Sequence, residues 1–252
     1  MQRFMKALAA IMLVVTVVCS ACTKDPENGG NGGNNGGGIN SNHEYVDLGL
    51  PSGTLWATCN VGATTPEGSG YYFAWGETTP KSNYEWSSYL FCDGSLMWSG
   101  GHDFMGLTKY CNKTEYGYNG FTDNLTSLLP EDDAATANWG DDWRTPSRIE
   151  WDELDAYCTA TLTTRNGVHG CLFTGPNGDS LFLLAAGYNG GNELLYAGSK
   201  GHYWSSSLNT YESYEACGFL FGSEYNNWYQ YTVDYDRFLG FPVRPVRSAR
   251  QN

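Results

Sequence analysis

The sequence predicts an α+β fold with small antiparallel sheets, one or two helices and long irregular loops. Three observations support this fold class. A capped helix start and a short apolar face occur together between Asn138 and Leu154. The last third alternates apolar and polar residues, as half-buried strands do. Aromatic residues make up 15% of the chain and glycine occurs 32 times, a mix that suits a secreted, loop-rich β protein.

Length and charge limit the function classes. The chain of 252 residues is long enough for one sizeable domain with a core. Its formal net charge of −13 argues against a nucleic-acid partner, because phosphate binding needs a basic face. No cluster of Lys and Arg supports a peripheral membrane patch.

The first 21 residues read as a signal peptide. Arg3 and Lys6 precede an apolar run, residues 7–18, that is short for a stable membrane span. The junction Ser20-Ala21-Cys22 resembles a bacterial lipobox, although Cys19 stands where Leu is usual. It predicts cleavage before Cys22 and lipid attachment to this cysteine. The alternative is an ordinary secretory signal without lipid.

Residues 22–43 read as a flexible tether, and residues 44–248 as the folded domain. The tether is rich in Gly and Asn and has almost no apolar side chains, so it cannot offset the entropy cost of ordering. Its early charges, Lys24-Asp25 and Glu27, resemble the acidic signal that sends lipoproteins of the Bacteroidota to the cell surface. We therefore expect an outer-membrane protein that faces the cell exterior and meets the membrane only through its lipid. The alternative is that these charges merely keep the tether solvated.

The best-defined element is a helix after Trp143-Arg144-Thr145-Pro146. Thr145 or Ser147 can cap it, and Glu150 stands three residues after Ser147, as in a capping box. Trp151, Leu154 and Cys158 follow at helical spacing and predict a buried face. Asp141-Asp142 follow Gly140 and suit a tight turn.

The expected strands lie on both sides of this helix. Pro242 and Pro245 place the last strand at a sheet edge or a bulge. In the 229–235 segment, the face with Gln230, Thr232 and Asp234 is expected to be exposed, and Trp228 with it. The segment from Thr78 to Thr126 has no persistent period and is expected to be irregular. The predicted strands are 55–61, 70–75, a buried central strand at 181–186, a meander of 203–207, 217–221 and 229–235, and the closing strand 240–247.

Several motifs occur in an order that resembles a known family. They are YVDLGLPSGTLWATCNVGA, YYFAWGE, LPEDDAATANWGDDWRTPSRIEWDEL, LLAAGYNGG, YWSSS and FPVRPVR. Together they resemble the Fibrobacter succinogenes major paralogous domain, found in secreted and lipid-anchored proteins of the Bacteroidota. The likeness covers nearly all of residues 44–247.

The resemblance implies a C-type-lectin-like fold, akin to the formylglycine-generating enzyme domain. In such folds the first and last strands pair, a helix follows the Trp-Arg-x-Pro element, and a long irregular region lies outside the small sheets. The resemblance further implies that residues 143–146 and Trp151 determine the fold. It implies little about activity, because a fold does not confer a function.

Cysteine positions suggest a disulfide and argue against one activity. Six cysteines remain beyond the lipobox, and an even number in an exported chain permits disulfides. Cys92 and Cys111 bracket the irregular region, so a bridge between them is the expected one. The alternative is free thiols buried in the core. For Cys158 and Cys217, which lie on apolar faces, the two alternatives carry equal weight. A formylglycine-type oxidase needs two neighbouring cysteines near the C-terminus, and Cys217 stands alone.

Calcium is the candidate metal, and no other cofactor is indicated. Two acidic clusters flank the approach to the helix, and hard carboxylate oxygens suit this ion. Against this hypothesis, the acidic motifs of sugar-binding C-type lectins are absent, and the same acids could cap turns or pair with arginines. The candidates are Glu131, Asp132, Asp133, Asp141 and Asp142.

Binding of a glycan or protein ligand at the cell surface is the favoured function. The aromatic-polar turn from Tyr225 through Asn226 and Asn227 to Trp228 joins two predicted strands that already supply core residues. Its aromatic rings are therefore surplus to packing and available for a ligand. The alternatives are a structural or assembly component without a small ligand, and then an enzyme. The sequence marks no catalytic pair, and His169-Gly170-Cys171 lacks a third orienting residue.

Overall fold

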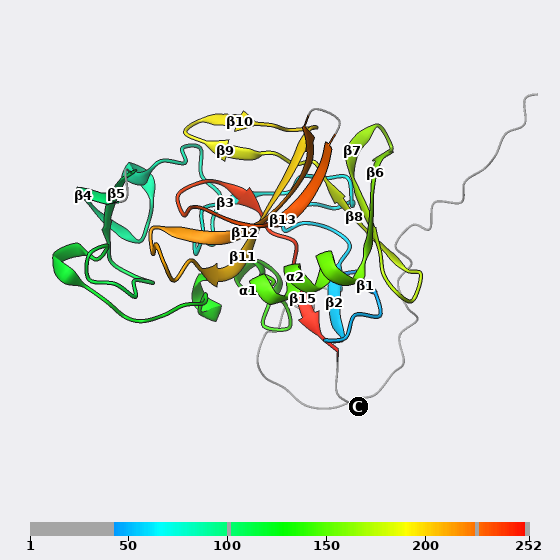
Figure 1. Ribbon diagram of the computed structural model, residues 1–252, viewed down its shortest axis with the longest axis horizontal. Helices are drawn as coiled ribbons and strands as arrows, with labels where there is room; N and C mark the ends of the chain where they lie inside the picture. The colour runs from blue at the N-terminus through cyan, green and yellow to red at the C-terminus, as the bar shows by residue number, and fades with distance from the viewer. Residues whose placement is uncertain (1–42, 100–101, 225–226, 250–252) are drawn as a thin grey trace, which may run out of the picture. The chain divides into compact units, whose positions relative to one another are not determined.

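The computed structural model describes residues 43–99, 102–224 and 227–249 (Figure 1). Within these residues the protein is mostly β, with two short α-helices and small antiparallel sheets. The helices are α1 (Ala134–Trp139) and α2 (Arg148–Tyr157), and short 3-10 turns cover Trp86–Ser88, Tyr118–Gly120 and Pro130–Asp132. The predicted α+β class is therefore correct at this level.

The described strands form six sheets. Three of these sheets have three strands and three have two. The three-stranded sheets are β1 (Tyr45–Asp47), β2 (Thr54–Ala57) and β15 (Val246–Ser248); β6 (Thr159–Arg165), β7 (Val168–Thr174) and β8 (Ser180–Leu184); and β11 (Lys200–Leu208), β12 (Glu215–Glu224) and β13 (Asn227–Asp236). The two-stranded sheets pair β3 (Tyr72–Phe73) with β14 (Phe241–Pro242), β4 (Cys92–Ser99) with β5 (His102–Leu107), and β9 (Tyr188–Gly190) with β10 (Glu193–Leu195).

Helix α2 begins as the capping box predicted. The Ser147 side chain accepts a hydrogen bond from the backbone N–H of Glu150, and the Glu150 carboxylate accepts one from the backbone N–H of Ser147. Ser147, and not Thr145, is therefore the capping residue. Trp151 and Leu154 are fully buried and Cys158 nearly so, which confirms the predicted apolar face.

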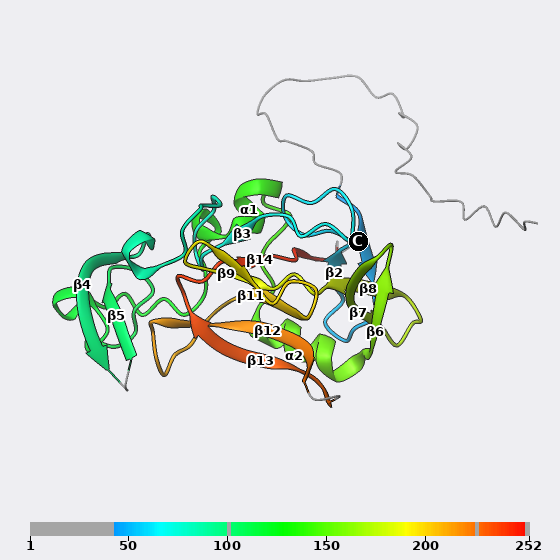
Figure 2. The ribbon, with the colours of Figure 1, turned by 90° about the horizontal axis from the view of Figure 1, so that it is seen from above.

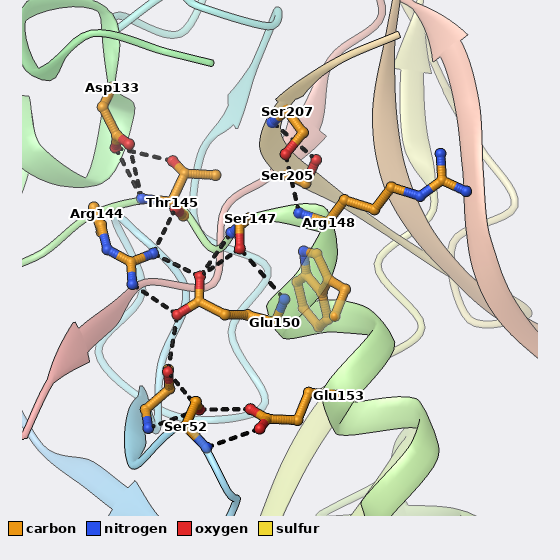
Figure 3. A network of polar contacts seen from close by, with 12 residues as sticks. Ser52, Asp133, Arg144, Thr145, Ser147, Arg148, Glu150, Glu153, Ser205 and Ser207 are labelled. Atoms are coloured by element: carbon orange, nitrogen blue, oxygen red, sulfur yellow. Dashed lines mark hydrogen bonds and ion pairs between the residues drawn. The ribbon is translucent and has the colours of Figure 1, made fainter. Parts of the chain in front are cut away.

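Glu150 also ties the helix to two distant parts of the chain (Figure 3). Its carboxylate accepts hydrogen bonds from both terminal nitrogens of Arg144, at 2.6 and 2.7 Å, and from the hydroxyl of Thr54 in β2. Burial alone would raise the pKa of Glu150, but the hydrogen bonds and charge of Arg144 hold it below its usual value. The backbone of Arg144 in turn exchanges hydrogen bonds with Val246 of β15.

The core lies on both sides of the β11–β12–β13 sheet. On one side, α2 packs against it, and the Trp151 ring stacks on Phe219 with centroids 4.7 Å apart (Figure 2). The Trp151 N–H donates to the backbone carbonyl of Trp204 at 3.2 Å. On the other side, Trp204 stacks on Phe241, with centroids 4.1 Å apart.

The meander β11–β12–β13 confirms the predicted order of the last three long strands. The prediction about its faces was wrong. Gln230 donates to the Asp155 carboxylate and Thr232 to the Asp152 carboxylate, both on α2. The polar face of β13 therefore packs toward the helix, because the helix presents acids there and polar side chains can pair with them.

Other predicted strands differ in length or place. The 55–61 strand is β2, which ends at Ala57, and the 70–75 strand contains only β3. The 181–186 strand corresponds to β8, which is buried on both faces but lies at the edge of its sheet and not at the centre. The closing segment forms β14 and then β15, and β15 lies at a sheet edge as its prolines predicted.

The segment from Thr78 to Thr126 is less irregular than expected. It contains the β4–β5 hairpin, which lies at the opposite end of the described domain from β6–β7–β8 (Figures 1 and 2). Alternation was hard to recognise there because small and polar residues interrupt it and the β4–β5 register shifts between Cys92 and Leu96. A long connection without regular structure is uncommon in compact domains, and this hairpin divides the segment into two shorter irregular parts.

The expected Cys92–Cys111 disulfide is absent, and this prediction was wrong. None of the six cysteines of the described residues forms a disulfide. The Cys92 thiol donates to the backbone carbonyls of Trp86 and Tyr89, both at 3.2 Å, and the Cys111 thiol donates to that of Lys113 at 3.0 Å. Hydrogen bonds and aromatic packing hold this region without a bridge. Among the described residues, no helix has the length and apolar character to cross a membrane.

Candidate functional site

The outer face of the β11–β12–β13 sheet carries an unusual row of tyrosines. Side chains alternate along each strand, so the residues between those that face α2 point to the opposite side. The register places Lys200, Gly222 and Tyr229 in one cross-strand row, and His202, Leu220 and Tyr231 in the next. Tyr235 follows further along β13 on the same side.

Five tyrosines form a connected surface, which we call the tyrosine face. Tyr188 and Tyr196 come from β9 and from the turn after β10, and their ring centroids are 5.9 Å apart. Tyr229, Tyr231 and Tyr235 come from β13, and the first two are also 5.9 Å apart. Tyr196 is 51% exposed and Tyr231 is 45% exposed. The face thus combines strands that are far apart in the sequence (Figure 1).

The rings rest on a buried aromatic floor. His202 contacts Tyr188, Tyr235 and Phe241 at centroid distances of 4.9, 5.6 and 5.4 Å. Burial lowers the pKa of His202 to about 3, and the charge of Lys200 adds to this effect, so the ring is neutral. Its Nδ1 has no hydrogen-bond partner among the described residues. Buried polar atoms are normally paired, so this one marks a place that packing alone does not explain.

The hydroxyls of the tyrosine face differ from those of several other tyrosines. Tyr72 donates to the Ala186 carbonyl at 2.7 Å, Tyr89 to the Trp75 carbonyl at 2.8 Å and Tyr203 to the Leu184 carbonyl at 2.8 Å. These hydroxyls stabilise the fold. Within the described part of the chain, no hydroxyl of the tyrosine face has a hydrogen-bond partner. They are therefore left for water or a ligand.

Tyr196 is held in an unfavourable backbone conformation. Its φ is 57°, in the left-handed region that side-chain-bearing residues seldom adopt. Its carbonyl accepts hydrogen bonds from the backbone of Ser199 and Lys200, and Gly187 packs against its backbone so closely that a Cβ there would lie 2.1 Å from the Leu195 oxygen. Local strain of this kind is often kept where a side chain must be aimed.

A groove lies near Tyr196, although none of the five tyrosines lines it. It has a volume of about 380 Å³ and runs beside the end of β10. Leu194 and Ala197, which flank the Leu195-Tyr196 pair, line one part of it, and Tyr72, Val168 and His169 line another. Rings, hydroxyls and a neighbouring groove together form a surface that can stack on a ligand and exchange hydrogen bonds with it.

The predicted ligand-binding turn lies next to the tyrosine face. Glu224 of β12 pairs with Asn227 of β13, so this hairpin contains the turn. Tyr225 and Asn226 lie outside the described residues, and for Asn227 and Trp228 the structure describes only the backbone. The turn therefore stays a prediction, and the tyrosines of β13 were not among the predicted ligand-binding residues. Their alternation was visible, and we interpreted it as core packing.

The calcium candidates do not come together. The Asp133 carboxylate accepts hydrogen bonds from the backbone N–H groups of Ala135, Thr136 and Thr145 and from the Thr145 hydroxyl (Figure 3). Asp132 faces Lys109 and Tyr110, while Asp142 lies 3.7 Å from Arg247.

Glu131 and Asp141 are exposed. In the described ranges, no three His, Cys, Asp or Glu residues are grouped as metal ligands would be. Asp133 caps backbone N–H groups, and Glu131, Asp132 and Asp142 lie near basic side chains.

The geometry around His169 and Cys171 does not support a nucleophilic cysteine. His169 is exposed, and its Nδ1 lies 3.0 Å from the Thr164 hydroxyl. Cys171 is fully buried, and burial raises the pKa of its thiol to about 12. A thiol of this kind is a poor nucleophile at neutral pH.

Comparison with known proteins adds no relative. No family model, curated protein or solved structure matches this chain. The site described above therefore rests on the geometry of this protein alone.

Proposed function

We propose that this protein is a surface binding module that holds carbohydrate on its tyrosine face. One observation carries the proposal: five neighbouring tyrosines, of which Tyr196 and Tyr231 are exposed and the others half-buried, have hydroxyls that make no hydrogen bond within the described residues. Rigid aromatic side chains of this kind provide contact area at low entropy cost. Sugar rings offer C–H faces that stack on aromatic rings and hydroxyls that pair with tyrosine hydroxyls.

The architecture supports a second part of the proposal, which concerns the family. We propose a C-type-lectin-like fold and membership in the Fibrobacter succinogenes major paralogous domain family. In support, β1 and β15 lie in one sheet on either side of β2, and α2 follows Trp143-Arg144-Thr145-Pro146. The first and last strands do not pair directly here, which departs from the simplest expectation for such folds.

The third part of the proposal concerns the location of the protein in the cell. The predicted lipid attachment at Cys22 and residues 22–42 of the predicted tether lie outside the described residues, and His43, its last residue, stacks on Trp139 of the domain. A lipid anchor in the outer membrane and a long tether would present the tyrosine face to the cell exterior. A structural role without a small ligand is the alternative, in which water alone pairs with the tyrosine hydroxyls.

Glycan-array screening followed by calorimetry tests this function. We expect Tyr196→Ala and Tyr231→Ala each to weaken carbohydrate binding about tenfold or more, as loss of a central aromatic contact does. Both rings are half exposed, so the melting temperature should change little. Tyr157→Ala is the matched control, because Tyr157 is 55% exposed on α2, on the other side of the sheet. Binding of proteins only, or undiminished glycan binding in both variants, would contradict the proposal.

A further inference from the structure

A pocket lined by hydroxyl side chains lies beside the first residues of α2. Its volume is about 390 Å³. Small-molecule sites in proteins have volumes of roughly 300–1,000 Å³, so this pocket has room for a small ligand. None of its lining residues belongs to the tyrosine face, which makes it a separate place on the protein. The hydroxyl side chains are those of Ser127, Thr136, Thr145, Ser147 and Ser206.

Ser206 of β11 gives this pocket a polar group without a partner. The residue is only 7% exposed, and its backbone is held on two sides. Its N–H donates to the Pro146 carbonyl at 2.8 Å, and its carbonyl accepts from the N–H of Leu128 at 2.9 Å. Its hydroxyl makes no hydrogen bond within the described part of the chain. Buried polar side chains are normally paired, so this hydroxyl is placed to meet whatever occupies the pocket.

The charged residues of the lining are already held by the protein (Figure 3). Both terminal nitrogens of Arg144 donate to the Glu150 carboxylate, at 2.6 and 2.7 Å. The Asp133 carboxylate accepts from the N–H and the hydroxyl of Thr145. Two carboxylates against one guanidinium disfavour an anionic ligand, and the guanidinium disfavours an ammonium ligand. The pocket therefore suits a neutral polar molecule.

We infer that this pocket binds a neutral sugar unit, which exchanges hydrogen bonds with the hydroxyls of Ser206 and Ser127. Ser127 is exposed, and its hydroxyl also has no partner among the described residues. A serine hydroxyl both donates and accepts, as a sugar hydroxyl does, so the two are matched. Leu128 and Pro130 add apolar contact for the C–H groups of the sugar. This site is additional to the tyrosine face and does not rest on the function proposed there.

Neutral and charged forms of the same sugars test this inference. The probes are glucose, galactose and mannose, each compared with its uronic acid and with its 2-amino form. Saturation-transfer NMR with the full-length protein detects binding, and a titration measures the affinity. We expect at least one of the neutral hexoses to bind about threefold or more tighter than its acid and amine.

Two variants of the pocket locate the bound sugar. Ser206→Ala removes one neutral hydrogen bond and should weaken binding about threefold or more. Ser127→Phe fills the pocket from its exposed side and should abolish binding. Ser82→Phe is the matched control, because Ser82 is equally an exposed serine and does not line the pocket. Since both phenylalanines replace exposed residues, the melting temperatures should change little.

The outcomes separate this pocket from the tyrosine face. The inference is overturned if no neutral hexose binds, if a charged form binds as tightly, or if either pocket variant binds as the unchanged protein does. It is also overturned if hexose binding is lost in Tyr196→Ala and Tyr231→Ala, and the tyrosine-face proposal then stands without it. If hexose binding depends on Ser127 and Ser206 while the tyrosine variants lose no glycan binding, the pocket stands and the tyrosine-face proposal fails.

Discussion

At the scale of single residues, Trp151 joins the most parts of the core. Its ring lies 4.7 Å from the centroids of both Trp56 and Phe219, and its N–H reaches the backbone of Trp204. It therefore links β2, β11 and β12 to helix α2. The sequence identified this residue because its helical spacing from the capping box was clear. The long-range partners could not be read from local patterns.

Trp151→Ala should destabilise the protein severely. Removing a large buried aromatic costs roughly 3–5 kcal/mol, and here a buried carbonyl also loses its donor. Urea denaturation measures the loss in the free energy of unfolding. Ile149→Ala is the control, because Ile149 is 78% exposed on the same helix and should cost little beyond its helix propensity. Similar losses in both variants would contradict the assignment of the buried face.

At the scale of elements, short-range sequence patterns predicted individual helices and strands. They did not predict which elements pack against one another. The capping box and the alternation of β12 and β13 were visible because each follows a short-range rule. The β6–β7 hairpin was missed, since its first strand, TATLTTR, is mostly exposed and has little apolar alternation. The face of β13 was misassigned, because Asp152 and Asp155 of α2 provide partners that a strand's own sequence does not reveal.

Glu215, at the start of β12, should make the free energy of unfolding depend on pH. Burial raises the pKa of Glu215 to about 7, and Glu212, Asp236 and Asp234 add to this effect against the hydrogen bond from Asn209. Between about pH 4.5 and pH 7 the folded state binds this proton more tightly than the unfolded state. The contribution of Glu215 to stability should therefore fall as the pH rises through this range and stay constant above it.

Glu215→Gln should remove this contribution, because the amide stays neutral. Urea denaturation at pH 5 and pH 8 checks this for both proteins. The loss of stability from pH 5 to pH 8 should be smaller in the variant. His202, whose pKa is lowered, acts in the opposite direction and is present in both, so the comparison isolates Glu215. The same pH dependence in both proteins would show that Glu215 titrates normally in the fold.

At the scale of the whole molecule, no disulfide among the described residues connects the small sheets of the domain. The six described cysteines form no disulfide, and burial raises the pKa of Cys158 to about 11 and that of Cys217 to about 12. Stability comes instead from the aromatic core and from buried arginines. Arg237 is fully buried and donates to the carbonyls of Tyr110, Ser213 and Lys109 at 3.0–3.1 Å.

A reducing agent should leave the melting temperature of the purified protein unchanged. Alkylation under native, oxidising conditions should modify Cys111, Cys171 and Cys217 slowly, because they are buried, and unfolding should make them react fully. Peptide mapping by mass spectrometry reads both results. A drop in melting temperature with dithiothreitol, or a cross-linked peptide pair, would show a bridge that the structure does not contain.

Alternating side chains of β13 face opposite sides of the sheet, so one set contacts α2 and the other set belongs to the proposed binding surface. Gln230 and Thr232 hold the strand to α2, while Tyr229, Tyr231 and Val233 point to the opposite side. Mutational drift in the second set can therefore alter what the protein recognises while the first set preserves the scaffold. A combinatorial library restricted to positions 229, 231 and 233 should yield mostly folded members with diverse ligand preferences, whereas one at positions 230 and 232 should yield mainly unstable members.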